Sequence, residues 1–314
     1  MKKLFLLDAN SLIHRAYHAL PPFTDVEGNP TGALYGLSTI LLKIVKDESP
    51  DYIAAFFDRP EATFRKKIFN DYKIHRPKAP DQLIAQIISS HNLFENFGMK
   101  IFESPGFEAD DLIGTAVEKF KNEPGLGITI FTGDMDSLQL IDNGHIQVKA
   151  LKTGVSQVAI YDEAAVKERY GVPPEDLPDY KGLVGDQSDN IPGVPGIGPK
   201  TASQIIQKYK TLENFFKDGK EDKSYAKIKE MKEQALLSRD LSTIKRDSPL
   251  EIKDISEISY PGLPLEKILE YFEKRGFKSL INRLSPNAEE ISPKPKTKKP
   301  KEEKKTPSQK QTLF

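Results

Sequence analysis

Nine acidic residues lie where several predicted strands end, open a predicted helix, or fall in a Gly-rich segment. They are Asp8, Asp58, Glu108, Asp110, Asp111, Asp134, Asp136, Asp186 and Asp189. Taken singly, each is better explained as a turn or helix-capping residue, because Asp is common in both positions. Taken together, carboxylates gathered at one edge of a sheet would repel one another and raise one another's pKa values unless a cation neutralised them.

This pattern predicts a metal site. The chain has no Cys, and the clustered acids offer only oxygen ligands, which favour Mg²⁺ or Mn²⁺. Because there are more acids than one ion can hold, we expect two or more ions, an arrangement suited to phosphodiester hydrolysis. None of the five His residues is paired in a way that suggests a general base, and no Ser-His-Asp arrangement competes with this interpretation.

The elements that would position these acids alternate between strands and helices. Apolar runs predict strands at 3–7, 52–57, 99–102, 128–131 and 146–148. Helical spacing of apolar residues predicts helices at 33–46, 82–97 and 110–120. This alternation is typical of an α/β fold with a largely parallel, twisted sheet flanked by helices. In such sheets the functional site lies beyond the carboxyl ends of the strands, where these acids fall.

The second half of the chain differs from the first in composition and in its predicted elements. A Gly/Pro-rich segment at 185–200 leads into helical stretches at 201–209, 225–238 and 265–275. After about residue 285 the sequence is rich in Pro and Lys, which is typical of disorder. We therefore predict a catalytic domain at 1–170, a smaller helical domain at 171–285, and a disordered basic tail at 286–314.

A basic segment follows Asp58. Residues 64–78 contain six Lys and Arg against one Asp. A charge run of this kind is most often a solvated helix face. Here the segment follows a predicted metal ligand, and Tyr72 beside Lys73 offers a stacking face next to a phosphate contact. These features favour DNA contact through Arg65, Tyr72, Lys73 and Arg76.

The Gly-rich segment also favours phosphate binding. It differs from a nucleotide-binding P-loop, because Pro199 rather than Gly precedes Lys200. Its glycines allow the backbone to approach a phosphate at the start of a helix whose N–H groups are free. A simple helix–helix turn, the alternative, would need fewer glycines. The residues we assign to DNA here are Gly193, Gly196, Gly198, Lys200 and Thr201.

Charge is unevenly distributed along the 314 residues. Residues 291–314 hold eight Lys and two Glu, and since the whole chain is neutral, residues 1–290 carry a net charge of −6. The clustered carboxylates account for an acidic body in a protein expected to bind nucleic acid. No apolar run is long enough to cross a membrane and the N-terminus does not resemble a signal peptide, so we expect a cytoplasmic protein.

Several motifs, in order along the chain, resemble one family. They are Leu-Asp-Ala-Asn-Ser at 7–11, Phe-Asp at 57–58, Thr-Phe-Arg at 63–65, Tyr-Lys at 72–73, Arg-Pro at 76–77, Glu-Ala-Asp-Asp at 108–111, Thr-Gly-Asp-Met-Asp at 132–136, and Gly-Asp-Gln-Ser-Asp-Asn at 185–190. Over residues 2–285 the chain is similar to the 5′ nucleases, which include the N-terminal domain of bacterial DNA polymerase I, phage 5′ exonucleases and flap endonucleases.

The resemblance implies a PIN-like fold and a DNA-binding helix–turn–helix in the helical domain. It implies one metal region formed by Asp8, Asp58, Glu108, Asp110, Asp111 and Asp134, and a second completed by Asp136, Asp186 and Asp189. Arg65 and Lys73 would act in catalysis, within an arch at about 64–95. The turn at 193–198 would bind duplex phosphates and a K⁺ ion. The implied activity is 5′-3′ exonuclease or 5′-flap endonuclease cleavage of nicked, gapped or flapped DNA by a monomer, leaving a 5′-phosphate.

The end of the chain departs from the polymerase arrangement. Only a short tail follows the predicted domains, so we expect either a free-standing nuclease or a fragment. Gln309, Leu313 and Phe314 resemble the peptides that dock into the bacterial sliding clamp, although the Gln is one residue too far from the end; an incidental sequence is the alternative. Two other functions stay open: a PIN-type RNase, and a non-catalytic DNA-binding or clamp-recruited protein on the same fold.

Overall fold

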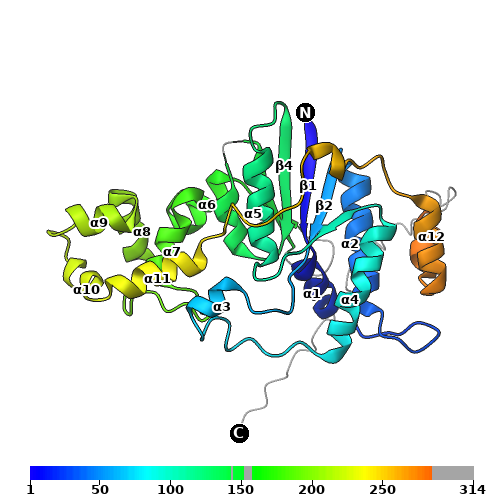
Figure 1. Ribbon diagram of the computed structural model, residues 1–314, viewed down its shortest axis with the longest axis horizontal. Coiled ribbons are helices and arrows are strands. Elements are labelled where there is room, and N and C mark those ends of the chain that lie inside the picture. The colour runs from blue at the N-terminus through cyan, green and yellow to red at the C-terminus, as the bar shows by residue number, and fades with distance from the viewer. Residues whose placement is uncertain (143, 152–157, 285–314) are drawn as a thin grey trace, which may run out of the picture.

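A six-stranded sheet forms the centre of the protein, with strand order β3-β2-β1-β4-β5-β6 (Figure 1). The computed structural model describes residues 1–142, 144–151 and 158–284. The strands are β1 (Lys2–Asp8), β2 (Tyr52–Phe56), β3 (Lys100–Phe102), β4 (Leu126–Thr132), β5 (Ile146–Leu151) and β6 (Val158–Tyr161). The first five are parallel, and β6 is antiparallel to β5. The carboxyl ends of β1 to β5 therefore meet at one edge.

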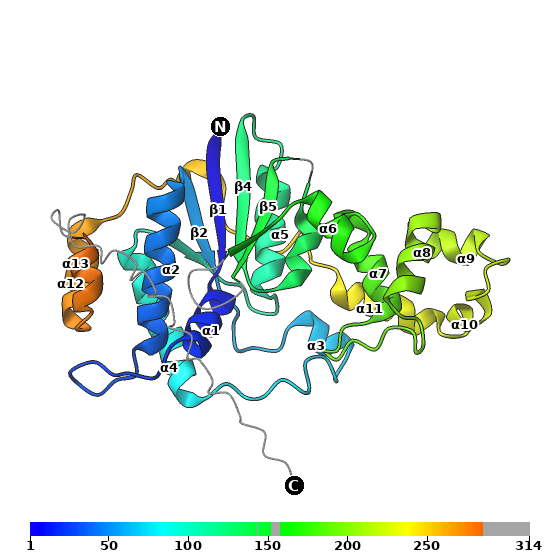
Figure 2. The same ribbon diagram turned by 180° about the vertical axis from the view of Figure 1, so that it is seen from behind.

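Helices cover both faces of this sheet, which explains the long apolar runs in its central strands. One face packs against α5 (Ala109–Phe120), and the other against α1 (Ala9–Ala19), α2 (Gly32–Glu48) and α4 (Asp81–Asn96) (Figure 2). Along β1, Leu4 and Leu6 belong to the core under α5, whereas Phe5 and Leu7 belong to the core under the other helices. This alternation is the two-residue period of a strand.

A helical lobe extends from one side of the sheet. It contains α6 (Glu163–Tyr170), α7 (Leu177–Val184), α8 (Pro199–Tyr209), α9 (Leu212–Asp218), α10 (Tyr225–Glu230) and α11 (Lys232–Ser242). In Figure 1, α8, α9 and α10 lie at its far end, and α7 and α11 pack together nearer the sheet. Short α3 (Phe64–Ile68) lies below, between the lobe and α4. The described residues also form three 3₁₀ helices: η1 (Met135–Leu140), η2 (Pro174–Asp176) and η3 (Ile255–Ile258).

The last helices return to the opposite side of the sheet. Helices α12 (Leu265–Lys274) and α13 (Lys278–Leu284) contribute Ile268, Phe272 and Leu280 to the core that holds α2 and α4. The Tyr260 N–H donates to Asp51 O at 2.8 Å, beside β2, as the chain crosses back. The region predicted as one helical domain at 171–285 is therefore divided between two sides of the molecule (Figure 1).

The predicted fold class is confirmed: the protein is α/β with a mostly parallel sheet flanked by helices. All five predicted strands are present, and β6 is an addition that the sequence analysis missed. The stretch 225–238, predicted as one helix, is two, because the chain leaves helical geometry at Met231. Among the described helices, none has the length and apolar character needed to cross a membrane.

Candidate active site

The carboxyl edge of the sheet opens into a cavity of about 860 Å³. Seven of the nine predicted acids line this cavity: Asp8, Asp58, Glu108, Asp110, Asp134, Asp136 and Asp186. Asp8 ends β1, Asp58 follows β2, and Asp134 follows β4, as the parallel topology predicts. Asp186 reaches the same cavity from the loop after α7. The structure thus brings together acids that are separated by more than half of the chain.

Backbone N–H groups at two helix N-termini hold two of these carboxylates. Asp8 accepts from Ser11 N at 2.9 Å and from Thr132 Oγ1 at 2.7 Å. Asp58 accepts from Ala109 N at 2.7 Å, at the first residue of α5. Helix N-termini carry partial positive charge and favour carboxylates. The two helices therefore orient their acids toward the cavity before any ligand arrives.

Burial leaves part of this acidic cluster under-neutralised. It raises the pKa of Asp8 to about 7, with the charge of Asp58 adding to the rise. Burial also raises the pKa values of Asp58 and, well above its ordinary range, Asp110. In the described part of the chain, no ion pair reaches Asp8, Asp58, Asp110 or Asp134, and Asp110 Oδ1 is buried without a hydrogen-bond partner. A divalent cation would neutralise these carboxylates and remove the electrostatic cost of burying them together.

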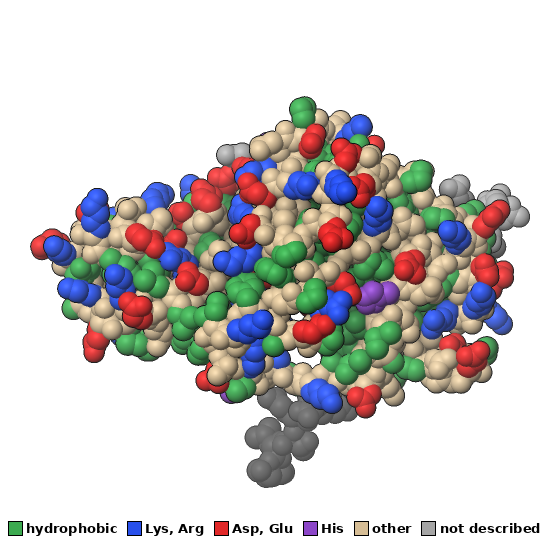
Figure 3. Space-filling model, in the orientation of Figure 1, with side chains coloured by type: hydrophobic (Ala, Val, Ile, Leu, Met, Phe, Trp, Pro, Cys, Tyr) green, Lys and Arg blue, Asp and Glu red, His purple; other side chains and the backbone are tan. Residues whose placement is uncertain are grey.

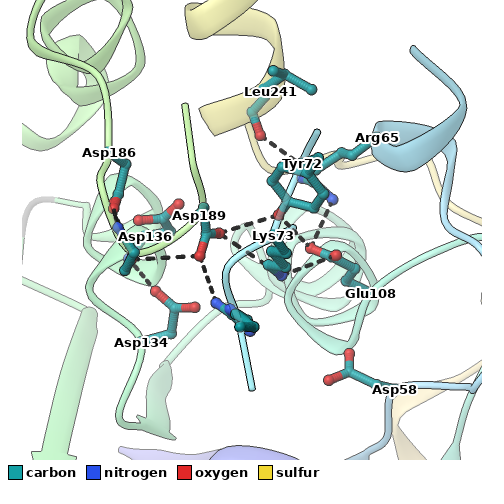
Figure 4. A network of polar contacts seen from close by, with 12 residues as sticks. Asp58, Arg65, Tyr72, Lys73, Glu108, Asp134, Asp136, Asp186, Asp189 and Leu241 are labelled. Atoms are coloured by element: carbon teal, nitrogen blue, oxygen red, sulfur yellow. Dashed lines mark hydrogen bonds and ion pairs between the residues drawn. The ribbon is translucent and has the colours of Figure 1, made fainter. Parts of the chain in front are cut away.

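The other acids are neutralised by cations of the protein itself (Figure 4). Lys73 Nζ lies 2.9 Å from Glu108, and Arg76 pairs with Asp189 at 2.5 Å. Lys181 contacts Asp136 and lies 2.8 Å from Asp186. Asp189 is buried at the centre of this network and is absent from the cavity lining, although its partners Lys73 and Arg76 line it.

The donor chemistry of the cluster fits a hard divalent ion, since it consists of carboxylates with no Cys in the chain. Over residues 1–142, 144–151 and 158–284, however, no three of these acids converge closely enough to hold an ion as they stand. Ion pairs with Lys73, Arg76 and Lys181 hold several of these carboxylates. Side-chain rotations would be needed to close a metal site.

Asp111 and Arg65 lie behind the cavity, not in it, which differs from their predicted roles. Asp111 is fully buried, and both of its oxygens accept from Arg65, at 2.7 and 2.8 Å. Arg65 is 2% exposed and uses its remaining donors on Glu108, Leu241 O and Thr243 O. Neither side chain is free for an ion or a phosphate. Their position indicates that they hold Glu108 in place.

Tyr72 also departs from its predicted role. The prediction gave it a free ring for stacking on a base, but the side chain is 4% exposed. Its hydroxyl donates to Glu108 at 3.1 Å and to Asp189 at 3.2 Å (Figure 4). Lys73 and Arg76, by contrast, do line the cavity. Of the predicted DNA contacts in this segment, these two cations are the ones placed to meet a phosphate.

The Gly-rich turn adjoins the cavity through Pro199, where α8 begins. Gly196, Gly198 and Lys200 are exposed there, and Thr201 is half-buried. Gly193 is buried instead.

Gly193 has a packing role. Both it and Gly185 adopt left-handed φ angles, of 61° and 76°. Their backbones pass so closely that a side chain on either would overlap the other's main chain. The Val194 N–H donates to Leu183 O at 2.7 Å beside this contact. The loop that begins at Asp186 is therefore fastened to the Gly-rich turn.

The sequence analysis missed several residues that line the cavity. His14 lies one turn along α1 from Asn10 and Ser11, and all three line the cavity. The usable signal was helical spacing after Asp8. Lys181 was also missed; it is a lysine on the otherwise largely apolar α7, five residues before Asp186.

The ion-free protein is expected to lose stability between about pH 4 and pH 7, in part through Asp8. Its pKa rises from 3.8 to about 7 on folding. A raised folded pKa gives stability that is complete below pH 3.8 and is lost as the pH rises through about 7. Melting temperatures measured in EDTA should therefore fall more steeply with pH for the wild type than for Asp8→Asn. Parallel curves for the two proteins would contradict this assignment.

Comparison with known proteins finds matches over most of the chain. Residues 3–171 match the family described as 5′-3′ exonuclease, N-terminal resolvase-like domain, and residues 172–262 match its C-terminal SAM fold. A 5′-3′ exonuclease of Aquifex aeolicus is 35% identical over 90% of this chain and 96% of its own length. DNA polymerase I of Bacillus subtilis is 38% identical over 92% of this chain, which spans only 33% of that protein.

Solved structures share the fold at lower identity. A zinc-bound 5′-exonuclease of bacteriophage T5 aligns with a TM-score of 0.62 and 21% identity, covering 77% of this chain and 89% of its own. A phage T5 flap endonuclease in a complex with DNA and metal ions has a TM-score of 0.63 and 18% identity, and the alignment covers 90% of this chain and 99% of the phage protein. With both parts of the family matched and a full-length relative at 35% identity, this chain belongs to the 5′-3′ exonuclease family.

Proposed function

We propose that this chain is a divalent-metal-dependent 5′ nuclease that hydrolyses DNA phosphodiesters at nicks, gaps and 5′ flaps. The observation that carries the proposal is the cavity at the carboxyl edge of the sheet, lined by seven acids and by Lys73 and Arg76. Acids that collect metal ions, next to cations that can hold a phosphate, suit phosphodiester hydrolysis. The family includes exonucleases, and the similar phage T5 structure is a flap endonuclease with DNA.

The acids without cation partners are the candidates for the first ion, and we take Mg²⁺ or Mn²⁺ as the metal. They are Asp8, Asp58, Asp110 and Asp134, which line the cavity. The candidates for a second ion are Asp136, Asp186 and the more deeply buried Asp189, each of which pairs with Lys181 or Arg76. Such ions supply an activated water and stabilise the leaving oxygen. The chain's own contribution is to place the phosphate: Lys73 and Arg76 face the cavity and can contact its oxygens.

The exposed part of the Gly-rich turn would hold the duplex beside the cut. Gly198 leaves the backbone open, the Lys227 ammonium lies beside exposed Gly196, and the free N–H groups at the start of α8 favour phosphate. Lys200 adds a positive charge at the same place. A K⁺ ion on the turn's carbonyls belongs to the same proposal. The similar phage T5 complex was solved with DNA.

Cleavage of a 5′-flap DNA, labelled at its 5′ end, tests the proposed activity. In Mg²⁺ the flap should be released as a short oligonucleotide, and EDTA should abolish the release. Single-stranded RNA of the same sequence serves as the competing substrate, because its preferential cleavage would indicate a PIN-type RNase. Tight flap binding without cleavage would indicate a DNA-binding protein on this fold.

Lys200→Ala is expected to weaken duplex binding and to reduce the slope of log affinity against log salt by about 1. The reason is that one phosphate contact releases about one counterion. Binding should be measured by fluorescence anisotropy at several salt concentrations in Ca²⁺ or EDTA. Lys278→Ala is the matched control, because Lys278 is exposed on α13, on the opposite side of the sheet. Equal slopes for the wild type and Lys200→Ala would favour a simple helix–helix turn.

Clamp binding by the C-terminal tail is part of this proposal, as are a monomeric state and a cytoplasmic, nucleoid-associated location. Gln309, Leu313 and Phe314 lie outside the described residues. An apolar end on a basic tether is suited to docking in the pocket of a sliding clamp. Deleting Leu313 and Phe314 should abolish co-elution with a bacterial clamp without changing flap cleavage by the isolated enzyme. Co-elution that survives the deletion would point to another contact.

A further inference from the structure

Lys181 projects from α7 into the acidic side of the cavity. Its ammonium contacts Asp136, at the start of η1, and lies 2.8 Å from Asp186 Oδ2. The lysine side chain is 10% exposed, and the two carboxylates are 13% and 21% exposed. Figure 4 shows Asp136 and Asp186 facing one another on one side of the network. A buried cation therefore occupies the space between two acids that could bind an ion.

The contact with Lys181 divides the lining acids into two groups, according to whether a bound metal ion must displace a cation of the protein. Asp8, Asp58, Asp110 and Asp134 have no ion pair among the described residues, so an ion bound there displaces no cation of the protein. An ion bound by Asp136 and Asp186 must take carboxylate oxygens from Lys181. Asp186 Oδ1 already accepts from Ser188 N at 2.9 Å and from Ser188 Oγ at 2.7 Å, which leaves few free lone pairs.

We propose that Lys181 is a resident counter-ion that competes with the divalent metal for Asp136 and Asp186. This inference rests on the proposed function. The side of the cavity at Asp8 fills first, and the side at Asp136 fills more weakly because the ammonium must move. Lys181 also neutralises the two acids while no ion is bound, which prevents them from destabilising the fold. Once displaced, the ammonium stays at the cavity wall, because α7 holds its backbone, and it can then contact a substrate phosphate.

Mn²⁺ binding measures this competition without relying on cleavage. The free ion is counted by electron paramagnetic resonance while Mn²⁺ is titrated into the full-length protein without DNA. The wild type should show tight and weak binding. Lys181→Met should bind the weak ion about tenfold to a hundredfold more tightly, the range expected from the loss of a competing charge-assisted hydrogen bond. Lys181→Gln, which is also uncharged, should behave in the same way, and Lys181→Arg should not.

Lys149 on β5 offers a matched control. Lys149 is 9% exposed and pairs with Glu48, away from the cavity. Lys149→Met removes an equally buried charge and should leave both Mn²⁺ affinities unchanged. Without ions, Lys181→Met should melt below the wild type, and saturating Mn²⁺ should close that gap. Lys149→Met should melt at a lower temperature than the wild type, and the difference should be the same with and without Mn²⁺.

The outcomes separate this inference from the proposed function. Unchanged or weaker binding of the second Mn²⁺ in both Lys181→Met and Lys181→Gln would overturn the counter-ion role, while flap cleavage by the wild type would still support the nuclease. If neither the wild type nor the variants bind Mn²⁺, the metal-dependent function fails, and the inference fails with it. A gain in affinity that Lys181→Arg reproduces would also overturn the role, because that variant retains the charge.

Discussion

Asp110→Asn should abolish flap cleavage and, in EDTA, raise the melting temperature of the protein. Asp110 lines the cavity, its pKa is well above the ordinary range because of burial, and its Oδ1 atom has no hydrogen-bond partner among the described residues. At pH 8 the ion-free fold must either bury the Asp110 charge or take up a proton there, and the variant avoids both costs. The expected rise is about 1.5 °C for each kcal/mol gained, since the unfolding entropy is about 2.1 cal/mol/K per residue in a chain of 314 residues.

The activity should fall by at least about 10²–10³-fold, the range for loss of one electrostatic contact to a transition state. Both quantities are measured on the same preparation, by single-turnover flap cleavage in Mg²⁺ and by thermal melting in EDTA. Asp247→Asn is the control, because Asp247 is exposed and should change neither. A variant that is inactive and melts lower would indicate that Asp110 is structural. An active variant would remove it from the metal site.

Asp111, the next residue along α5, is expected to stabilise the ion-free protein, in contrast to Asp110. Asp111→Asn should lower the free energy of unfolding in EDTA, and Arg65→Met should lower it by about 3–5 kcal/mol, because breaking a buried pair leaves an uncompensated charge. Arg65 makes five hydrogen bonds, two of them to Asp111 and two to the main chain at Leu241 and Thr243. Arg65→Lys should not restore this stability, since an ammonium cannot reach all of these acceptors.

A double-mutant cycle isolates the pair. Arg65→Met combined with Asp111→Asn should lose about 1–3 kcal/mol less than the sum of the single losses, as expected for groups in direct contact. Urea unfolding in EDTA gives each value without interference from metal. If Asp111 served instead as a metal ligand, Asp111→Asn would stabilise the ion-free protein, as Asp110→Asn should. The two adjacent acids thus provide internal controls for each other.

The sheet and the acidic edge could be predicted because both depend on local patterns. Apolar runs mark buried strands, and in parallel sheets the residues after those runs converge. The sequence analysis placed Asp8, Asp58 and Asp134 at the edge for this reason, and these three line the cavity. Helix α1 was missed because it begins at Ala9, directly after the last residue of β1, without an intervening loop between strand and helix.

Long-range partners could not be predicted from these patterns. Asp110 and Asp111 are adjacent in sequence, yet they lie about 100° apart around α5, so one faces the cavity and the other faces Arg65. Helical spacing could have suggested that Asp110 and Asp111 point in different directions, but no local sequence pattern identifies Arg65 as the partner of Asp111. The same limit applies to α12, because an amphipathic helix can bury its apolar face against either side of a molecule.

The close contact between the Gly185 and Gly193 backbones couples two parts of the proposed site. One side of the contact begins the loop with Asp186, and the other begins the exposed turn at Gly196. No side chain intervenes, so the distance between duplex contact and acidic edge is set by main-chain packing. On the proposed function, this spacing determines which phosphodiester, counted from the duplex, reaches the acids. The length of the released product is then a property of the backbone, and substitutions in the cavity should change the rate of cutting and leave its position unchanged.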